Sequence, residues 1–511
     1  MPHLLSLLPD FALEDEMVII QAFYRAFAGD FDNYAFFKYP GLFYLVIIPL
    51  YYALFLAYNF KTLIHLKTLS DFLNFASHPV LSEAGMVLIG RTLSLFFGIT
   101  SALVLVEIFK KRASKRISLI GALILLSSPT WLFCSEILKN DTLLLFLVYL
   151  TFWSSLLIYE QGKKKHYILA GILAGLCLAC KLYFFSLILP VIAHWRKAKK
   201  ENKNGIEIWG EKKILLSFLI CLLTFLLFNP FQALQPKNTF KETLLELALM
   251  RGAQNILQAS PELWYHSTFL FQILCALPLA MGILGFLAGA GGIFFLTKKL
   301  KRDEFIIYIS CPAFYFFFWA VVSEQGLPHY YLTLAGFLAP AGGAFFDWLL
   351  SRRTFVKAVG ILALFFSVMF NFLFSQEINQ AQESIMKESF SWAYENISPK
   401  EKVYAFLPYR PLYESNYYWR FEFYPQFMLT KKLLKKAKPK RLLIHEFYYF
   451  AYLNNPQARN PSWWGFLELY QKGSGYELKR RWQNKLFWAK IYKKLFPDLN
   501  YISVGYYELT F

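Results

Sequence analysis

Carboxylates and lysines of the kind that move protons and bind phosphate interrupt apolar stretches of this chain. Asp15 and Glu16 close an acidic run near the N-terminus, Asp141 lies between two apolar runs, and Lys181 lies at the end of another. A carboxylate can accept the proton of an acceptor hydroxyl, and a lysine can bind the phosphate of a leaving lipid carrier. A solvated charge run at residues 14–16 and a snorkelling lysine at residue 181 are the alternatives.

The composition decides the surroundings of these residues. The chain has 511 residues, 57% of them hydrophobic and only 17% charged, with 54 Phe and 32 Tyr. A soluble chain has about 45–50% apolar and about 25% charged residues. The composition therefore indicates a polytopic membrane protein and excludes a disordered, collagen-like or disulfide-rich chain.

The net charge of +19 follows the membrane pattern as well. Basic residues gather in short clusters between apolar runs, at 110–116, 163–165, 196–200, 298–302 and 352–353. Cytoplasmic loops of membrane proteins carry such an excess of Lys and Arg. The clusters therefore predict the cytoplasmic side of a membrane and not a nucleic-acid partner.

Apolar runs long enough, or nearly long enough, to cross a bilayer divide the chain. They lie at 86–108, 117–135, 141–159, 167–181, 183–195, 213–228, 268–297, 305–322, 330–350 and 354–375. With the basic clusters inside, residues 1–85 form a first outer loop and 86–375 form the membrane bundle. The run 41–60 either enters from the cytoplasm or lies along the outer face, and the acidic residues within 1–40 favour the second. Residues 376–511 then lie outside.

The C-terminal segment differs in character from the bundle. Helical spacing at Ile385, Phe390 and Trp392 precedes a strand-like run at 402–407. The expected fold is thus mostly α: a polytopic transmembrane helical bundle with a small α/β extracytoplasmic domain. All six cysteines lie in apolar stretches, where a free Cys acts as a small hydrophobe, so we expect neither disulfides nor a zinc site.

Several motifs together resemble a known family. In chain order they are Asp15-Glu16, a loop that contains Lys38-Tyr39-Pro40-Gly41, Arg91-Thr92-Leu93-Ser94, Lys139-Asn140-Asp141, the Gly-rich run that ends at Lys181, and Asn229-Pro230. The chain resembles the integral-membrane glycosyltransferases of the GT-C fold, specifically the family 39-like enzymes. These include protein O-mannosyltransferases and bacterial lipid A aminoarabinose transferases.

The resemblance implies inverting transfer of a sugar from a polyprenyl-phosphate carrier to a lipid, glycan or protein acceptor, outside a bacterial plasma membrane. Asp15 would be the base, with Glu16 and Asp141 completing the acidic site. The residues implied for substrate or phosphate binding are Lys38, Tyr39, Arg91, Lys181 and His329. No cofactor and no metal is expected, and the other partners are membrane lipids.

The chain departs from the family pattern at two places. Family members have a spanning helix before the Asp-Glu pair, whereas only fourteen residues precede Asp15 here. In the late loop they often carry Arg-Tyr where this chain has His329-Tyr330, and a neutral His binds phosphate less reliably than Arg.

A transporter or flippase of a lipid-linked saccharide is the alternative from another class. Transporters usually have internal repeats and broken mid-membrane helices. The sequence predicts neither, and its polar candidates gather at the outer interface. A membrane anchor for an outer binding domain is a third interpretation, for which ten spans would be unnecessary.

Overall fold

The computed structural model describes residues 11–13, 16, 19–20, 42, 46–47, 49–50, 53, 83–203, 211–237, 240–241, 268–322, 328–406, 409–411, 421–423, 434, 436, 438–446, 475–485 and 501–509. Asp15, Lys38 and Tyr39 lie outside the described residues, as does most of the run 41–60.

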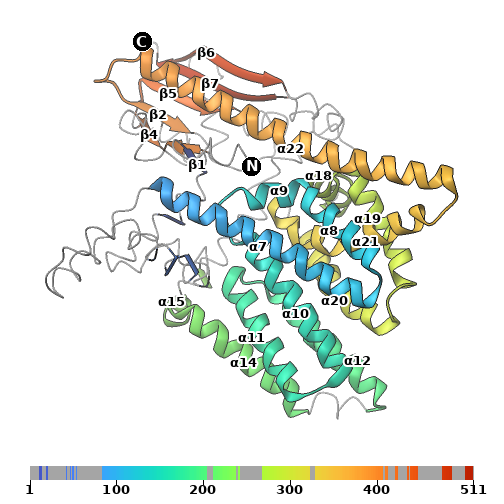
Figure 1. The fold of residues 1–511 in the computed structure, drawn as a ribbon. Helices are drawn as coiled ribbons and strands as arrows, with labels where there is room; N and C mark the ends of the chain where they lie inside the picture. The colour runs from blue at the N-terminus through green and yellow to red at the C-terminus, as the bar shows by residue number, and fades with distance from the viewer. Residues whose placement is uncertain are drawn as a thin grey trace, which may run out of the picture.

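Helices make up most of the described chain (Figure 1). The longer ones are α7 (Glu83–Arg112), α8 (Lys115–Ser127), α10 (Asp141–Gln161), α11 (Lys164–Lys181), α12 (Ile188–Lys200), α14 (Lys212–Phe228), α19 (Ile283–Thr297), α20 (Arg302–Val322), α21 (Leu332–Leu350) and α22 (Thr354–Asn396). The shorter ones are α9 (Pro129–Ser135), η1 (Phe184–Leu187), α15 (Pro230–Leu234), α17 (Thr268–Phe271), the π-helix η2 (Gln272–Ala276), α18 (Leu277–Met281) and η3 (Pro328–Tyr331).

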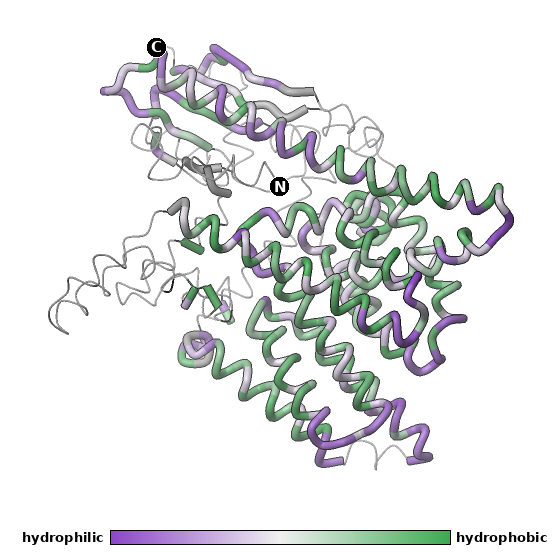
Figure 2. The backbone as a smooth tube through the Cα atoms, viewed as in Figure 1, coloured by the Kyte–Doolittle hydropathy of each residue, from purple (hydrophilic) through white to green (hydrophobic). Residues whose placement is uncertain are grey.

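Hydrophobic residues make up most of the helices of the bundle, whereas hydrophilic residues gather at its loops and on the C-terminal part (Figure 2). Within the described residues, four helices are long and apolar enough to cross a membrane, and up to six spans result if each of two bent helix pairs counts as one. The predicted architecture, a polytopic helical bundle followed by a small α/β part, is confirmed. The division at residues 85 and 375 stays a prediction, because α22 continues without a break from Thr354 to Asn396.

Both bent pairs contradict the expectation that no helix breaks inside the bundle. α8 and α9 meet at 65°, where Ser128 caps α9 and Pro129 occupies its first turn. The segment Gln272–Met281 meets α19 at 113°. Gly282 makes this second bend at φ 75°, and Asn371 of α22 donates to the freed Met281 carbonyl at 2.9 Å. A Gly–Ala–Leu-rich apolar run gives no hydropathy signal for such a bend.

A tyrosine compensates for a proline inside α21. Pro340 has no N–H for the carbonyl four residues earlier, which belongs to Gly336. The Tyr149 hydroxyl of α10 donates to that carbonyl at 2.7 Å. The missing Cβ of Gly336 leaves room for this contact, since a Cβ there would lie 2.8 Å from the hydroxyl oxygen. α10 and α21 are thereby joined in the core.

The C-terminal strands form a five-stranded mixed sheet in the order β4-β2-β5-β7-β6. The strands are β2 (Val403–Phe406), β4 (Phe421–Phe423), β5 (Arg441–His445), β6 (Tyr476–Lys485) and β7 (Tyr501–Leu509). β2 is parallel to β4 and β5, and β7 is antiparallel to β5 and β6. A separate antiparallel pair joins β1 (Phe11–Leu13) to β3 (Tyr409–Pro411), so the N-terminal segment reaches the C-terminal part.

α22 links the bundle to this sheet (Figure 1). Its last turns pack on the sheet through Trp392, whose ring centroid lies 5.4 Å from that of Trp482 and 4.8 Å from that of Tyr506. We call α22 from residue 376 onward, together with β2–β7, the C-terminal unit.

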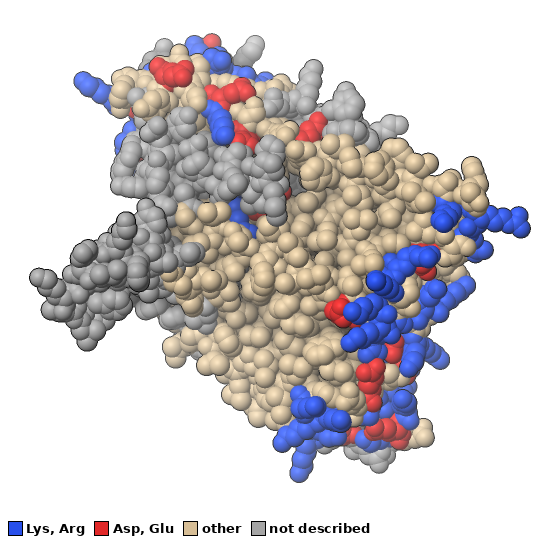
Figure 3. Space-filling model, in the orientation of Figure 1, with Lys and Arg blue, Asp and Glu red and all other residues tan. Residues whose placement is uncertain are grey.

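The basic clusters gather along one edge of the bundle, with few Lys or Arg on the apolar face beside it (Figure 3). Some are neutralised internally: Arg112 at the end of α7 pairs with Glu160 and Glu304, at 2.8 Å each. This edge lies at the C-terminal end of α7 and at the N-terminal ends of α8 and α11.

Candidate active site

A buried ion pair joins the acidic N-terminal segment to α7. Arg91 donates from Nε and Nη2 to the two carboxylate oxygens of Glu16 at 2.8 and 2.7 Å. Glu16 is fully buried and Arg91 is 3% exposed. A two-pronged contact of this kind fixes orientation as well as charge. Glu16 is therefore held against the third turn of α7.

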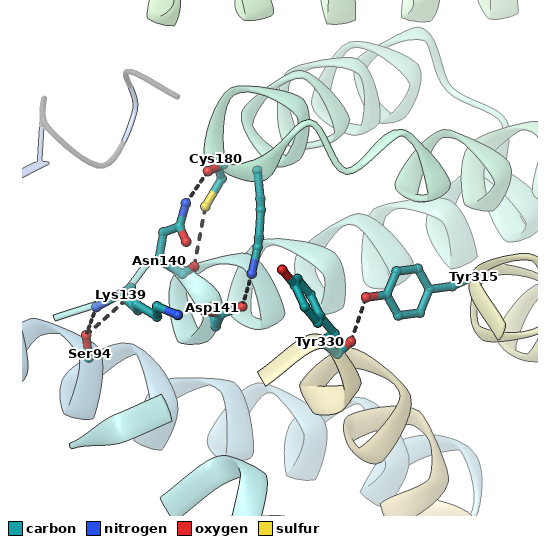
Figure 4. Close-up of polar contacts among 8 residues, drawn as sticks. Ser94, Lys139, Asn140, Asp141, Cys180, Tyr315 and Tyr330 are labelled. Carbon is teal, nitrogen blue, oxygen red and sulfur yellow. Dashed lines mark hydrogen bonds and ion pairs between the residues drawn. The ribbon is translucent and has the colours of Figure 1, made fainter. Parts of the chain in front are cut away.

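The stretch 136–140 between α9 and α10 lies against the same pair. The Leu138 N–H donates to Oε1 of Glu16 at 2.8 Å. The Leu138 side chain fills the space left by Gly90, one residue before Arg91, because a Cβ on Gly90 would overlap it. The Ser94 hydroxyl, one turn further along α7, donates to the Lys139 carbonyl at 3.0 Å (Figure 4).

The next two residues of the chain contact the end of α11. The Asn140 side-chain amide donates to the Cys180 carbonyl, and the Cys180 thiol donates to the Asn140 carbonyl at 3.5 Å (Figure 4). Asp141, the first residue of α10, forms an ion pair with Lys181. Asp141 is 3% exposed, whereas the Lys181 side chain is 28% exposed, so the carboxylate is buried and the lysine reaches the surface.

The local structure at the end of α11 directs Lys181 toward Asp141. α11 ends at Lys181, and Leu182 then takes the left-handed conformation at φ 51°. A non-glycine residue with this φ is uncommon and costs free energy, and such strain is concentrated at functional sites. The turn leaves Lys181 as the last side chain on α11, facing the start of α10.

Tyr330 of the 3-10 turn η3 lies beside Lys181. The Lys181 ammonium lies 5.4 Å from the centroid of the Tyr330 ring, within the range of a cation–π contact. The Tyr315 hydroxyl donates a hydrogen bond to the Tyr330 carbonyl at 2.6 Å (Figure 4). The His329 ring lies against the Tyr330 ring, with the centroids 4.2 Å apart and the ring planes inclined at 43°.

The two carboxylate oxygens of Asp141 have different surroundings. Oδ1 of Asp141 faces Lys181, whereas Oδ2 is buried and has no hydrogen-bond partner among the described residues. The Asn140 Oδ1 and Thr142 Oγ1 atoms beside it are likewise buried without a partner in the described part of the chain. Buried polar atoms of this kind are rare and call for an occupant such as water or a ligand. Asp141 can thus accept a proton or a hydrogen bond.

The structure brings together Glu16, Arg91, Asp141 and Lys181 of the predicted site residues, and it places His329 beside Tyr330. Asp15, Lys38 and Tyr39 lie outside the described residues, so their places in the site stay predictions. No group of three or more His, Cys, Asp or Glu residues in the described ranges could hold a metal ion.

The sequence analysis assigned no role to the Leu138 N–H, Asn140 or Tyr330. A backbone donor carries no residue-type signal, and Asn140 was visible only as the neighbour of Asp141. Tyr330 was noted as the partner of His329 in the late loop, which was the available hint.

Comparison with known proteins identifies part of the chain. Residues 86–239 match the family model described as dolichyl-phosphate-mannose-protein mannosyltransferase. Arg91, Asp141 and Lys181 all lie within this stretch. Over this stretch the chain is similar to a family of glycosyltransferases. The predicted family resemblance is confirmed over these residues. No curated protein sequence matches the chain.

Solved glycosyltransferases resemble the fold weakly. ArnT from Cupriavidus metallidurans, solved bound to undecaprenyl phosphate, is 11% identical, with 92% of this chain and 88% of that one covered at a TM-score of 0.45. AglB, an archaeal oligosaccharyltransferase from Archaeoglobus fulgidus solved with an inhibitory peptide and a dolichol-phosphate, is 12% identical, with 78% and 62% covered at a TM-score of 0.42. These values are too low to transfer a residue role from either protein.

Proposed function

We propose that this glycosyltransferase moves a sugar from a polyprenyl-phosphate carrier to an acceptor hydroxyl, with inversion at the anomeric carbon, on the extracytoplasmic side of a bacterial plasma membrane. The observation that carries the proposal is the Asp141–Lys181 pair at the meeting point of α10 and α11. Lys181 pairs with Oδ1 of Asp141, whereas Oδ2 of the same carboxylate is buried without a hydrogen-bond partner among the described residues.

The reaction needs a proton acceptor and a group that stabilises the leaving phosphate. The acceptor oxygen forms a bond to the anomeric carbon while the bond from that carbon to the phosphate oxygen breaks. The electron pair leaves with the polyprenyl phosphate, whose new charge Lys181 would stabilise. The hydroxyl proton passes to a carboxylate. Asp15 is the proposed base, with Asp141 completing the acidic site.

Glu16 and Arg91 receive a different role in this proposal. Both carboxylate oxygens of Glu16 already accept hydrogen bonds, and two nitrogens of the Arg91 guanidinium donate to them. We therefore propose that they are positioning residues: their ion pair fixes Glu16, and with it the neighbouring Asp15, against α7. Lys38, Tyr39 and His329 keep their proposed place as donor-binding residues.

The direction of the helices supports the proposed orientation. α7 carries Arg91 near its start and ends at the basic Lys110–Arg112 turn. α11 starts with lysines and ends at Lys181 of the site. The site and the basic clusters therefore occupy opposite ends of the same helices, and basic clusters mark the cytoplasmic side.

A transporter of a lipid-linked saccharide remains the second candidate, favoured by the two bent helix pairs, since broken helices recur in transporters. The match to a glycosyltransferase family favours the enzyme. Catalysis and transport separate in detergent, where only a transferase releases the carrier phosphate.

The test is release of polyprenyl phosphate from synthetic undecaprenyl-phosphate sugars (mannose, glucose and 4-amino-4-deoxyarabinose) by detergent-purified protein. Asp15→Asn keeps the side-chain shape and removes the proton acceptor, so we expect turnover to fall by about 10²–10⁴-fold. Glu395→Gln on the exposed surface of α22 is the matched control, with wild-type turnover expected.

Each result has a distinct meaning. Release that requires Asp15 supports the transferase and names the donor sugar. Release at the wild-type rate by Asp15→Asn removes the base assignment. No release from any donor, with or without a mixture of hydroxyl acceptors, contradicts the proposed reaction.

A further inference from the structure

The stretch 136–141, which includes Asp141 of the proposed site, contacts α22 outside the core of the bundle. Oε2 of Glu136, the residue that caps the end of α9, accepts a hydrogen bond from the Asn379 side-chain amide at 2.5 Å. Asn379 lies on α22, 243 residues further along the chain. Glu136 is thus tied to the helix that leads into the C-terminal unit.

The other residues of this stretch face the site itself. Leu138 contacts Glu16 and Lys139 contacts Ser94, while Asp141 contacts Lys181. Only Ile137 separates Glu136 from Leu138, so we expect a shift of Glu136 to move the Leu138 N–H that donates to the Glu16 carboxylate. A shift of the same peptide segment also moves the start of α10 and hence Asp141.

α22 is one continuous helix of 43 residues, from Thr354 to Asn396. Near its end Phe390 packs on Phe421 of β4, with ring centroids 4.7 Å apart, and Trp392 packs on β6 and β7. The position of Asn379 is therefore fixed by the sheet on one side and by the bundle on the other.

A second contact joins the C-terminal unit to the acidic N-terminal segment. β1 pairs with β3 in the register Phe11↔Pro411 and Leu13↔Tyr409. β1 ends three residues before Glu16 and two before Asp15. Both acidic segments of the site, 15–16 and 136–141, are thus attached to the C-terminal unit by independent contacts.

We propose that the C-terminal unit positions the acidic site, with Asn379 as a positioning residue that sets the stretch 136–141 through Glu136. The inference rests on the proposed function, because the readout is turnover. Reacting groups must be aligned to within about 1 Å, and a misplacement of that size costs about 10²-fold in rate. A hydrogen bond at the edge of the site can therefore matter for turnover without holding the fold together.

The decisive experiment exchanges the donor and the acceptor of the hydrogen bond between Asn379 and Glu136. Asn379→Asp places a carboxylate against the Glu136 carboxylate, and we expect kcat to fall about ten- to hundredfold while KM for the donor changes less than about threefold. The double variant Asn379→Asp with Glu136→Gln restores the contact, since the Gln amide now donates to the Asp carboxylate. We expect it to recover most of the lost kcat.

Controls separate this role from folding and from the parent proposal. Asn396→Asp makes the same chemical change at an exposed position of α22 and should leave turnover unchanged. Asn379→Ala covers the case in which the Asp variant does not fold. All variants are compared by thermal unfolding in the same detergent.

The outcomes are distinguishable. If the wild type releases no polyprenyl phosphate, the proposed function fails first. If the wild type is active and Asn379→Asp and Asn379→Ala turn over normally, the positioning role is wrong. A loss that the polarity swap does not restore, or one matched by a lowered unfolding temperature, also overturns it, because the contact would then be only structural.

Discussion

The Arg91 guanidinium donates hydrogen bonds to both carboxylate oxygens of Glu16, which lies 75 residues earlier in the sequence. The side chains of Arg91 and Glu16 are 4% and 0% exposed, respectively. Breaking a buried pair by removing one partner leaves an unpaired buried charge and costs about 3–5 kcal/mol. This pair joins the N-terminal acidic segment to the bundle, so its loss affects both stability and the site.

We first predict that Arg91→Lys fails to replace Arg91. A lysine keeps the charge but cannot donate in parallel to both oxygens of Glu16. Turnover should fall and the unfolding temperature should drop, as measured by thermal unfolding of detergent-purified protein. The double variant Glu16→Gln with Arg91→Gln should be more stable than Arg91→Ala alone, and the reverse order would show that the pair is not the cause.

Lys181 and Asp141 should affect donor binding with opposite signs. Lys181→Ala removes a charged hydrogen bond, worth about 1.5–3 kcal/mol, and should weaken binding of undecaprenyl phosphate about ten- to hundredfold. Asp141→Asn removes the carboxylate that occupies Lys181 in the free protein. It should therefore tighten binding of the same lipid while it lowers turnover.

Titration of the purified variants with undecaprenyl phosphate, followed by tryptophan fluorescence, measures both effects. Lys400→Ala, at an exposed position after α22, is the matched control. Unchanged affinity in Lys181→Ala would remove Lys181 from the phosphate site, and weaker binding in Asp141→Asn would show that the carboxylate does not compete for it.

Tyr149→Phe should destabilise the core without touching the site. It leaves the buried Gly336 carbonyl without a donor, because Pro340 supplies none, at a cost of about 1–3 kcal/mol. Tyr308→Phe is the comparison: Tyr308 donates to the Phe337 carbonyl, which the helix can also satisfy through the Ala341 N–H. Thermal unfolding should show a larger drop for Tyr149→Phe, and equal drops would contradict the compensation for Pro340.

The C-terminal sheet should lose stability in mild acid through His445. This residue is fully buried at the end of β5, and burial lowers its pKa to about 3. The unfolded chain has a His pKa of about 6.5. Between these values the unfolded state binds the proton and the folded state does not, so stability falls as pH drops from about 6.5 toward 3.

Comparison of unfolding temperatures at neutral and mildly acidic pH measures this effect. His445→Leu cannot titrate and should show a smaller drop between the two pH values than the wild type, even if it is less stable at both. The neighbouring Glu446, paired with Arg481 at 2.7 Å, is the same in both proteins. Parallel drops in the two proteins would exclude His445 as the cause.

The sequence alone determined the class of the molecule. Apolar runs, basic clusters and the change of character near residue 375 predicted a helical membrane bundle with a mixed C-terminal part. These properties depend on composition and local spacing, since an apolar segment in a bilayer must satisfy its own backbone polar groups, and a helix does so with local hydrogen bonds. The motifs also brought Glu16, Arg91, Asp141 and Lys181 forward as candidates, because an ionisable residue beside apolar sequence needs a reason.

Only the tertiary structure decided which of these residues meet. The contacts of Glu16 with Arg91, of Asp141 with Lys181 and of Glu136 with Asn379 join positions 40 to 243 residues apart, and no local pattern encodes a partner at that distance. The bend at Gly282 and the Tyr149 contact with Gly336 were hidden for the same reason. Each depends on a donor supplied by another helix, so it exists only once the helices have packed.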